Sequence, residues 1–425
     1  MKPIHLFVVI AINIVLTYEV GLAQSRSVQM LYSFDYSDTD DGFDLAASAW
    51  SATGTYLALA TNTRVYLLEA QTGNRVRDHE IEAQQIMWNP ENEQYIITTM
   101  PDENGNLEIL SWNVDTGEQV YTISATGFVL SNYSNSFFLV DDAREDRVEI
   151  YSVRDGQSVS TLEIEQDQLF ATWLTDEIVR VATETDSQFY QYDSGFLIGS
   201  ASRPVADWEL VSEITPGISF PIAGQRSDST DQFVTVNVRN VLEDTYTATI
   251  EVQGFVNNVE LLPQHNLLVA AYVDPNGYSH IAMWDMKQNR LLSDDIITEV
   301  PYVINGLYPD ITAEHIAFRY DLRTYNEEFE TDVDLPNGGF GILTLNDNSY
   351  VEILNIPVSD ISWHPDQSKF ATSGDFGAVW DVDGELIHGL GNAWYVEWSP
   401  DGNFLFSAHR DGTAKIWEMV EGNSH

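Results

Sequence analysis

Hydrophobic and polar residues alternate in short runs along most of the chain, and turn residues separate the runs. Side chains of a β-strand point alternately to the two faces of a sheet, so this pattern predicts strands rather than helices. The pattern is clearest in two neighbouring units, ISWHPDQSKFATSGDFGAVWDVDG (361–384) and VEWSPDGNFLFSAHRDGTAKIWEM (396–419). In each unit a first strand ends in Trp, a Pro-Asp turn follows, and a polar turn later leads into a third strand. A repeated strand–turn–strand–turn–strand unit is typical of a propeller blade.

The same unit can be followed upstream through the last residue of each first strand, which we call the anchor. Anchors recur every 35 to 55 residues, around the ~40–45-residue period of such repeats. They are Trp50, Trp88, Leu130, Trp173, Trp208, Leu262, Tyr308, Trp363 and Trp398. Because propellers usually have ~4–8 blades, we expect an all-β fold: a single closed β-propeller of about eight four-stranded blades, with seven to nine allowed. No stretch rich in Pro, Gly or Ser divides residues 24–425, so one domain is predicted.

Unpaired strands at the two ends of the repeat region suggest how the ring closes. Val28–Phe34 reads as a strand that precedes the first full unit, and Ala414–Met419 is the third strand of a last unit that lacks a fourth. We expect these two segments to pair, which would leave neither strand with a free edge.

The last two units also carry recognisable motifs. Val379-Trp380-Asp381 is a tryptophan-aspartate strand ending, and Ser399–Gly402 (SPDG) is a turn between first and second strands. These residues resemble the WD40-repeat family. The resemblance implies a propeller that serves as an interaction scaffold, and it implies no enzymatic activity. It also implies a hydrogen-bonded structural tetrad, of which Ser407, Asp411 and Trp417 match three members. For the fourth, the family's Gly-His pair, this chain has His388-Gly389 in reversed order.

Residues 1–23 have the composition of a signal peptide. Lys2 precedes an apolar run from Leu6 to Leu16, and Gly21 and Ala23 place small residues before Gln24. The run is shorter than the ~20 residues that span a bilayer. We therefore expect cleavage near Ala23-Gln24 and a secreted or periplasmic protein without stable membrane insertion.

The charge of the chain limits its partners. It has 66 acidic and 19 basic residues, a formal charge of −47. Nucleic acid is excluded as a direct partner because phosphates need Lys and Arg, whereas a basic protein partner is compatible. The alternative is that the charge only maintains solubility or suits a salty habitat. The absence of cysteine excludes disulfides, thiol catalysis and Cys-ligated metals.

The longest acidic segments are predicted between second and third strands or between units, which places them on one face of the ring. Loops on a rigid scaffold commonly carry binding residues. The candidates for partner binding are Asp141, Asp142, Glu327, Glu328, Asp332 and Asp334, together with Trp394 and Tyr395 as the aromatic residues expected to be exposed.

One acidic loop loosely resembles a calcium-binding loop. Asp38, Asp40, Asp41 and Asp44 supply carboxylates, but Gly42 falls one place too early for an EF-hand. Calcium is the one cofactor that the sequence suggests, and a solvated acidic loop is the alternative.

Signals for catalysis are poor. The chain has no G-x-S-x-G, H-E-x-x-H, Walker or dinucleotide motif. Its histidines lack ligand spacing and are interpreted as turn or packing residues, and His409 beside Asp411 as a candidate for a structural hydrogen-bond network. We therefore predict a non-catalytic, secreted interaction scaffold. The alternatives are an extracellular hydrolase or lyase with a site in the central funnel, and a calcium-stabilised surface protein.

Overall fold

The structure, a computed structural model, describes residues 9–10, 27–35, 45–61, 63–80, 83–101, 107–125, 128–131, 136–142, 147–164, 168–173, 176–183, 186–202, 209–211, 219–225, 233–240, 245–262, 265–288, 290–298, 302–310, 312, 314–322, 338–346, 349–354 and 356–420. Within these ranges the regular elements are strands, as predicted. A search of the same ranges for an apolar helix of membrane-spanning length found none.

The strands form eight hydrogen-bonded sheets. The first four sheets are β3–β6 (Leu45–Trp50, Tyr56–Thr61, Val65–Glu69, Arg75–His79), β7–β10 (Gln85–Trp88, Tyr95–Pro101, Leu107–Asn113, Gln119–Ala125), β11–β14 (Phe128–Ser131, Phe137–Asp142, Arg147–Ser152, Ser158–Glu163) and β15–β18 (Gln168–Trp173, Ile178–Thr183, Asp186–Gln191, Leu197–Ser202). The next three are β19–β22 (Glu209–Val211, Ser219–Gln225, Phe233–Asn240, Thr245–Gln253), β23–β26 (Phe255–Leu262, Leu267–Val273, Ser279–Asp285, Arg290–Thr298) and β27–β30 (Tyr302–Pro309, His315–Leu322, Gly339–Thr344, Ser349–Leu354). The six-stranded sheet contains β31 (Val358–Trp363), β32 (Lys369–Asp381), β33 (Leu386–Trp398), β34 (Phe404–His409), β35 (Thr413–Val420) and β2 (Ser27–Asp35).

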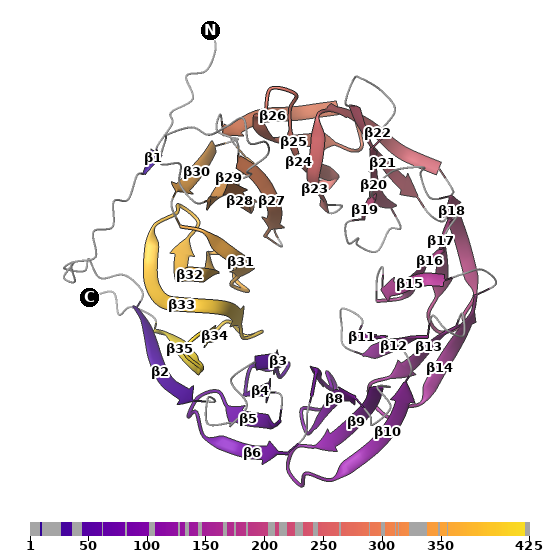
Figure 1. Cartoon of the computed structure of the whole chain (residues 1–425), viewed down its shortest axis with the longest axis vertical. Helices are drawn as coiled ribbons and strands as arrows, with labels where there is room; N and C mark the ends of the chain where they lie inside the picture. Colours follow the sequence, from indigo (N-terminus) through magenta and orange to yellow (C-terminus); the bar gives the residue numbers. More distant parts are fainter. Residues whose placement is uncertain are drawn as a thin grey trace.

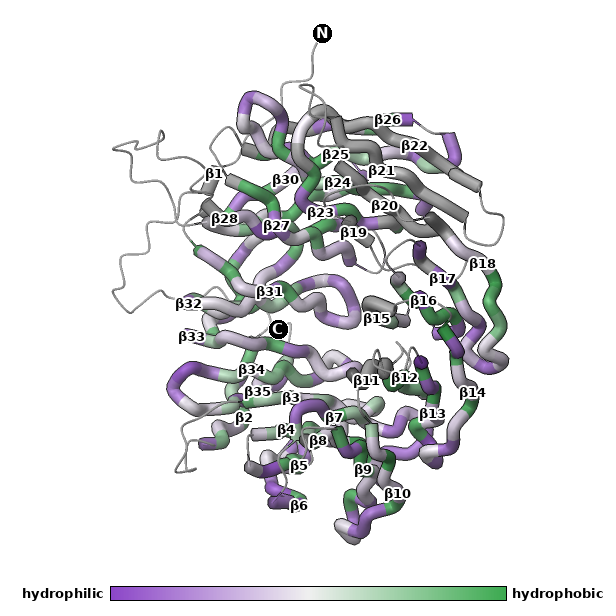
Figure 2. Tube along the Cα trace, turned by 45° about the vertical axis from the view of Figure 1, so that its right-hand side comes forward, coloured by the Kyte–Doolittle hydropathy of each residue, from purple (hydrophilic) through white to green (hydrophobic). Residues whose placement is uncertain are grey.

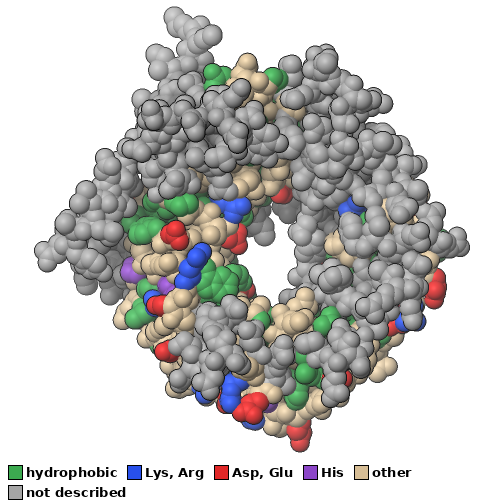
Figure 3. All heavy atoms as spheres, viewed as in Figure 1, with side chains coloured by type: hydrophobic (Ala, Val, Ile, Leu, Met, Phe, Trp, Pro, Cys, Tyr) green, Lys and Arg blue, Asp and Glu red, His purple; other side chains and the backbone are tan. Residues whose placement is uncertain are grey.

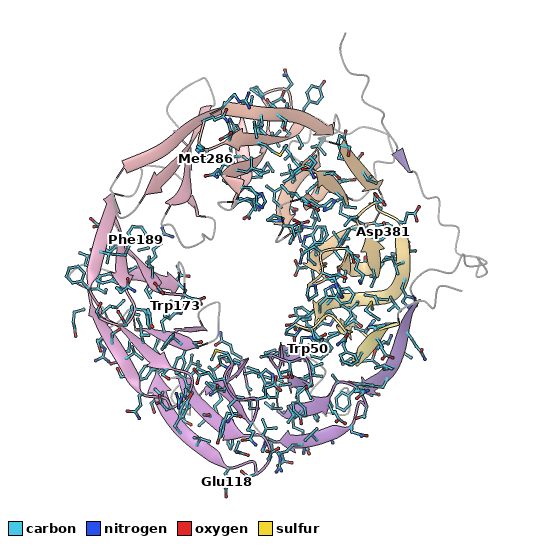
Figure 4. The ribbon with its side chains drawn as sticks, turned by 180° about the vertical axis from the view of Figure 1, so that it is seen from behind. Trp50, Glu118, Trp173, Phe189, Met286 and Asp381 are labelled. Carbon is cyan, nitrogen blue, oxygen red and sulfur yellow. The ribbon has the colours of Figure 1, made fainter. Side chains whose placement is uncertain are left out.

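The sheets follow one another around a central opening, which confirms a β-propeller (Figure 1). In each four-stranded sheet the first strand lies nearest the opening and the fourth at the outer edge, as Figure 1 shows for β3–β6. Figure 4 shows the anchors Trp50 and Trp173 on the inner side and Glu118, in a turn before a fourth strand, at the periphery. β1 (Val9–Ile10), within the predicted signal peptide, pairs parallel with β30.

Most anchors end their strands where the sequence placed them. The anchors that are the final residue of a strand are Trp50, Trp88, Trp173, Leu262, Trp363 and Trp398. Leu130 and Tyr308 lie one residue before the ends of β11 and β27, and Trp208 lies outside the described residues. The repeat was therefore visible in the sequence because a large residue recurs at the same structural position.

The six-stranded sheet holds two successive units, because β32 and β33 each serve twice. The first part of β32 pairs with β31, with Trp363 opposite Phe370, and its last part pairs with the start of β33, with Trp380 opposite Leu386. The end of β33 then pairs with β34, with Trp398 opposite Leu405. The other seven sheets have four or five strands and form one blade each. The number of sheets does not equal the number of blades, because the six-stranded sheet holds two units. The count of about eight blades therefore stays a prediction.

The final unit consists of residues 393–420 and β2, and the first unit of β3–β6. β2 pairs with β35, as predicted for these two segments; the pairing is antiparallel, with Val28 opposite Met419 and Phe34 opposite Ala414. From β2 the Tyr32 hydroxyl donates to the carbonyl of Ala70 in the first unit, at 3.2 Å. Tyr121 in β10 makes the equivalent bond to Val153 of the following unit, at 2.9 Å. The N-terminal strand thus contacts the first unit as an ordinary fourth strand contacts the unit that follows it.

Buried apolar side chains pack between neighbouring sheets. Between the first and final units, Trp50, Leu57 and Leu59 pack with Phe406 and Ile416. Apolar strand segments alternate with polar turns along the chain (Figure 2). Because each sheet covers the apolar face of the next, the core is divided among the junctions instead of lying at the centre.

Candidate functional site

The strand ends define two faces of the ring, and the expected acidic segments can be assigned by the strands that flank them. Residues 323–337 connect β28 to β29, and residues 143–146 connect β12 to β13, so both join a second strand to a third. Residues 36–44 connect β2, the outer strand of the final unit, to β3. In an antiparallel meander these two kinds of connection share one face, here named face A. Face B carries the first-to-second and third-to-fourth turns.

The described residues cover only part of these candidates. The four aspartates of the calcium-like loop and Glu327, Glu328, Asp332 and Asp334 lie outside the described residues. Asp141 and Asp142 end β12 and pair through their backbones with Val148 and Arg147. No group of three or more His, Cys, Asp or Glu side chains that could hold a metal occurs in the described part of the chain.

Many aspartates stabilise the turns in which they lie. Asp274 accepts hydrogen bonds from the backbone amides of Asn276 and Tyr278, both at 2.9 Å. Asp401 of the SPDG turn accepts from the Asn403 amide at 3.1 Å and from the Ser399 hydroxyl at 2.6 Å. Aspartates that accept backbone amides in the same way are Asp155, Asp285, Asp310, Asp366, Asp381 and Asp411. Part of the negative charge therefore has a structural role, since an Asp carboxylate that accepts a backbone amide two residues later closes an Asx turn.

Several acidic side chains are exposed at face A in the described part of the chain, among them Asp360, Asp375 and Glu80. Asp360 lies near the start of β31, and Asp375 lies in the bend of β32, two residues beyond the partner of Asp360. Acidic and basic side chains are visible around the opening in Figure 3. Asp360 and Asp375 therefore lie on the face for which the sequence predicted acidic loops.

His280 lies among polar side chains near face A, and sequence reasoning assigned it only a turn or packing role. Its Nδ1 lies 3.0 Å from Asp294 Oδ1, and its Nε2 lies 3.6 Å from Asp274 Oδ2. The Tyr272 ring stacks on the imidazole, with 4.6 Å between ring centroids, and the Tyr272 hydroxyl donates to Asp294. Burial lowers the pKa of His280, but Asp294 and then Asp274 raise it by more, so the net pKa is raised. The cluster joins a face A turn to β26, which is a structural role.

Trp394 and Tyr395 are not the exposed aromatic pair that the sequence suggested. Both are half-buried and pack against the apolar cluster between the first and final units. Their rings lie 6.0 Å apart, and the Tyr395 ring lies 6.1 Å from that of Phe406. The expectation failed because a turn-like sequence, Gly389–Asn392, continues into the innermost strand of the final unit.

Tyr395 belongs to a polar contact between the first and final units. The Tyr395 hydroxyl and the Ser48 hydroxyl both donate to Glu397 Oε2, at 3.2 Å and 3.0 Å. Burial raises the pKa of Glu397 to about 7, although both hydrogen bonds act in the opposite direction. Burial, the charge of Glu397 and the more distant Asp360 raise the pKa of Tyr395. Sequence reasoning missed Glu397 because one Glu among 66 acidic residues carries no signal.

Three residues of the final unit are linked by hydrogen bonds, and their histidine is His409 and not His388. Trp417 Nε1 donates to Ser407 Oγ at 2.8 Å, and Ser407 Oγ lies 2.8 Å from Nε2 of His409. Burial, followed by the charge of Lys415, lowers the pKa of His409 to about 4, so this imidazole is neutral near pH 7. His388 instead packs edge-on against Trp417, with ring centroids 5.2 Å apart. Asp411 accepts hydrogen bonds from Thr413 in the adjoining turn.

The Trp-to-hydroxyl bond recurs in other units. Trp112 Nε1 donates to Thr98 Oγ1, and Trp380 Nε1 donates to Thr372 Oγ1, both at 3.0 Å. Each bond joins a third strand to a second strand, as Trp417–Ser407 does. The signal was present in the sequence as a Ser or Thr 8 to 14 residues before a Trp.

Comparison with known proteins agrees with this architecture. Residues 377–418 match the family model of the WD domain, G-beta repeat. A crystal structure of a eukaryotic initiation factor is similar at a TM-score of 0.59 and 13% identity, over 83% of this chain and 89% of that one. The crystal structure of the C-terminal WD40 domain of Sif2 is similar at a TM-score of 0.50 and 14% identity, over 94% of this chain and 100% of that one. No curated protein matches at the sequence level.

At such identities the structural neighbours establish the fold alone. The matched residues 377–418 include the strand ending at Trp380 and the Trp417–Ser407 bond, which are the features that the sequence identified. The chain is therefore a β-propeller with a WD40 repeat at residues 377–418, and the resemblance drawn from its motifs is confirmed.

Proposed function

We propose that this protein is a secreted, non-catalytic scaffold that binds a basic protein partner through face A. WD40 propellers generally serve as protein-interaction scaffolds. The observation that supports face A is strand order: Asp141 and Asp142 end β12, and residues 323–337 follow β28, so both segments come after the second strand of a sheet. The exposed Asp360 and Asp375 add negative charge to that face.

Face B is the less suitable surface for an electrostatic partner. Several of its described aspartates, among them Asp366, Asp381 and Asp401, accept hydrogen bonds within their own turns. Removing them would disturb the fold, whereas the long connections of face A can vary without loss of strand pairing. Export of the protein follows from the signal-peptide pattern of residues 1–23, with cleavage near Ala23-Gln24.

The test compares two charge-matched variants of the full chain. In the first variant, the face A residues Asp141, Asp142, Glu327, Glu328, Asp332 and Asp334 are changed to the corresponding amides. In the control, six exposed acidic residues of face B that accept no capping bond are changed in the same way: Glu91, Glu118, Asp193, Glu314, Asp383 and Glu385.

Partners captured from the native secretome by the wild type should be lost by the face A variant and retained by the control. Their binding to the wild type should weaken as salt is raised, because exposed charges are screened. Equal capture by the face A variant and the wild type would show that face A does not bind the partner.

A further inference from the structure

The junction between the first and final units lacks a hydrogen bond that other junctions have. Trp398 Nε1 donates to the carbonyl of Ser362 in the preceding unit at 3.0 Å, and Trp88 Nε1 donates to the carbonyl of Ala49 at 2.8 Å. Trp50 is the corresponding anchor of the first unit. Its Nε1 is buried and has no hydrogen-bond partner among the described residues.

A carboxyl group occupies this junction instead. Ser48 donates to Glu397 from the first unit, and Tyr395 donates to it from the final unit, so Glu397 bridges the two. Trp50 stacks on Phe404 of the final unit at 6.4 Å, which surrounds the junction with apolar surface. Glu397 is half-buried, and a partly desolvated charge without a counter-charge is disfavoured.

The charged and titratable groups around Glu397 include no cation within ion-pair distance in the described part of the chain. On its own strand the neighbour is Tyr395, and beyond it Asp360 from β31 is a further negative group. His409 of β34 hydrogen-bonds Ser407 in the Trp417 network, which packs on the opposite side of the final sheet. Arg75 of the first unit lies over the Tyr66 ring.

We propose that Glu397 is a proton-dependent contact that controls how tightly the first and final units pack together. The neutral carboxyl accepts both hydroxyls without placing a charge in the apolar junction. The ionised carboxylate requires hydration, and water reaches it most readily when the two units separate beside Trp50. Since burial raises the pKa of Glu397 to about 7, the transition falls near neutral pH.

The absence of natural cysteine allows a direct measurement of this opening. Ala408, fully buried in the cluster between the first and final units, is changed to Cys as the reporter. Ala271, fully buried between the β23–β26 and β27–β30 sheets, is changed to Cys as the control. The rate of reaction with a thiol reagent is followed from pH 6 to pH 8, and the ratio of A408C to A271C removes the effect of thiol ionisation.

The ratio should rise about tenfold between pH 6 and pH 8, the change expected for one group that titrates near pH 7. Adding Glu397→Gln, which keeps the acceptor oxygen but cannot ionise, should hold the ratio constant. A constant ratio in the Glu397 background, or a rise that persists with Glu397→Gln, would overturn the proposal.

A second measurement needs no reporter substitution. Amide hydrogen exchange, corrected for intrinsic rates, should show β2 and β3 losing protection between pH 6 and pH 8 while β12 does not. The Glu397→Gln protein should keep protection in β2 and β3 at both values. Equal behaviour of β2, β3 and β12 in both proteins would refute local opening even if A408C did not fold.

Discussion

The two junctions on either side of the final unit perform the same task with different chemistry. On one side, the anchor Trp398 donates to the Ser362 carbonyl, a bond between neutral groups that does not depend on pH. On the other side, Trp50 has no such partner, and Ser48 and Tyr395 converge on Glu397. A repeat fold needs the same shape at every junction, but each junction can reach it with its own polar contacts. Where the first and final units meet, the polar contact contains a titratable group, Glu397.

The largest effect should come from removing the strand that completes the final unit. Deletion of residues 24–35 removes β2, including Val28 in the core and the Tyr32 bond to Ala70. We expect the Tm in a thermal melt to fall on the order of 5 °C, because a loss of several kcal/mol shifts the Tm of a ring of this size by ~1 °C per kcal/mol. A chain lacking residues 421–425, which follow β35, is the control. An unchanged Tm would mean that β2 adds little to the junction.

Next in size are two opposite pH dependences within the final unit. The pKa of Glu397 rises from 4.5 to about 7 on folding, so its contribution is complete below pH 4.5 and is lost as pH rises through 7. The pKa of His409 falls from 6.5 to about 4, so its contribution is complete above pH 6.5 and is lost as pH falls through 4. Each difference corresponds to about 3 kcal/mol.

Urea unfolding at several values between pH 4 and pH 8 separates the two groups. Glu397→Gln removes the loss of stability that occurs as pH rises through 7, so its unfolding free energy minus that of the wild type should rise with pH. His409→Gln removes the loss that occurs as pH falls through 4, so its unfolding free energy minus that of the wild type should fall with pH. Parallel curves for the two variants would show that neither group titrates as its surroundings imply.

The smallest expected effect is the difference in unfolding free energy between substitutions of the two anchor tryptophans, Trp398 and Trp50. Trp398→Phe removes the donor to the half-buried Ser362 carbonyl, whereas Trp50→Phe removes no hydrogen bond among the described residues. Both substitutions remove a similar volume from a buried site. We expect Trp398→Phe to lower the free energy of unfolding by about 1–2 kcal/mol more than Trp50→Phe in urea titrations. Equal losses would show that the indole bond does not distinguish the junctions.

Sequence patterns predicted the strands and the repeat because both depend on local chemistry. The Pro-Asp turns are specified by residues that lie next to one another, as the Asp401 bonds to Ser399 and Asn403 show. Gly402 adopts a φ of +73°, and a Cβ there would lie 2.6 Å from His364 Nε2. The SPDG motif predicted a turn at Gly402. It could not predict that His364, from another unit, lies close to this glycine.

The candidate site was harder to predict because its contacts join distant segments. Ser48 and Glu397 are 349 residues apart in the chain. His388 was considered for the tetrad by its proximity to a glycine, yet His409 forms the bond because alternation along β34 places it on the same side as Ser407. Trp394 and Tyr395 were expected to be exposed, but the first unit covers them when the ends of the repeat region meet.

The sequence by itself determined the all-β architecture, the WD40 repeat and the strand that pairs with β35, because periodicity and turn chemistry repeat along the chain. Tertiary structure alone decided which histidine joins Ser407, which aromatic residues are covered, and which of many carboxyl groups lies half-buried between two units. Burial and the pKa of a group depend on all neighbours in space, and here the decisive neighbours come from opposite ends of the chain.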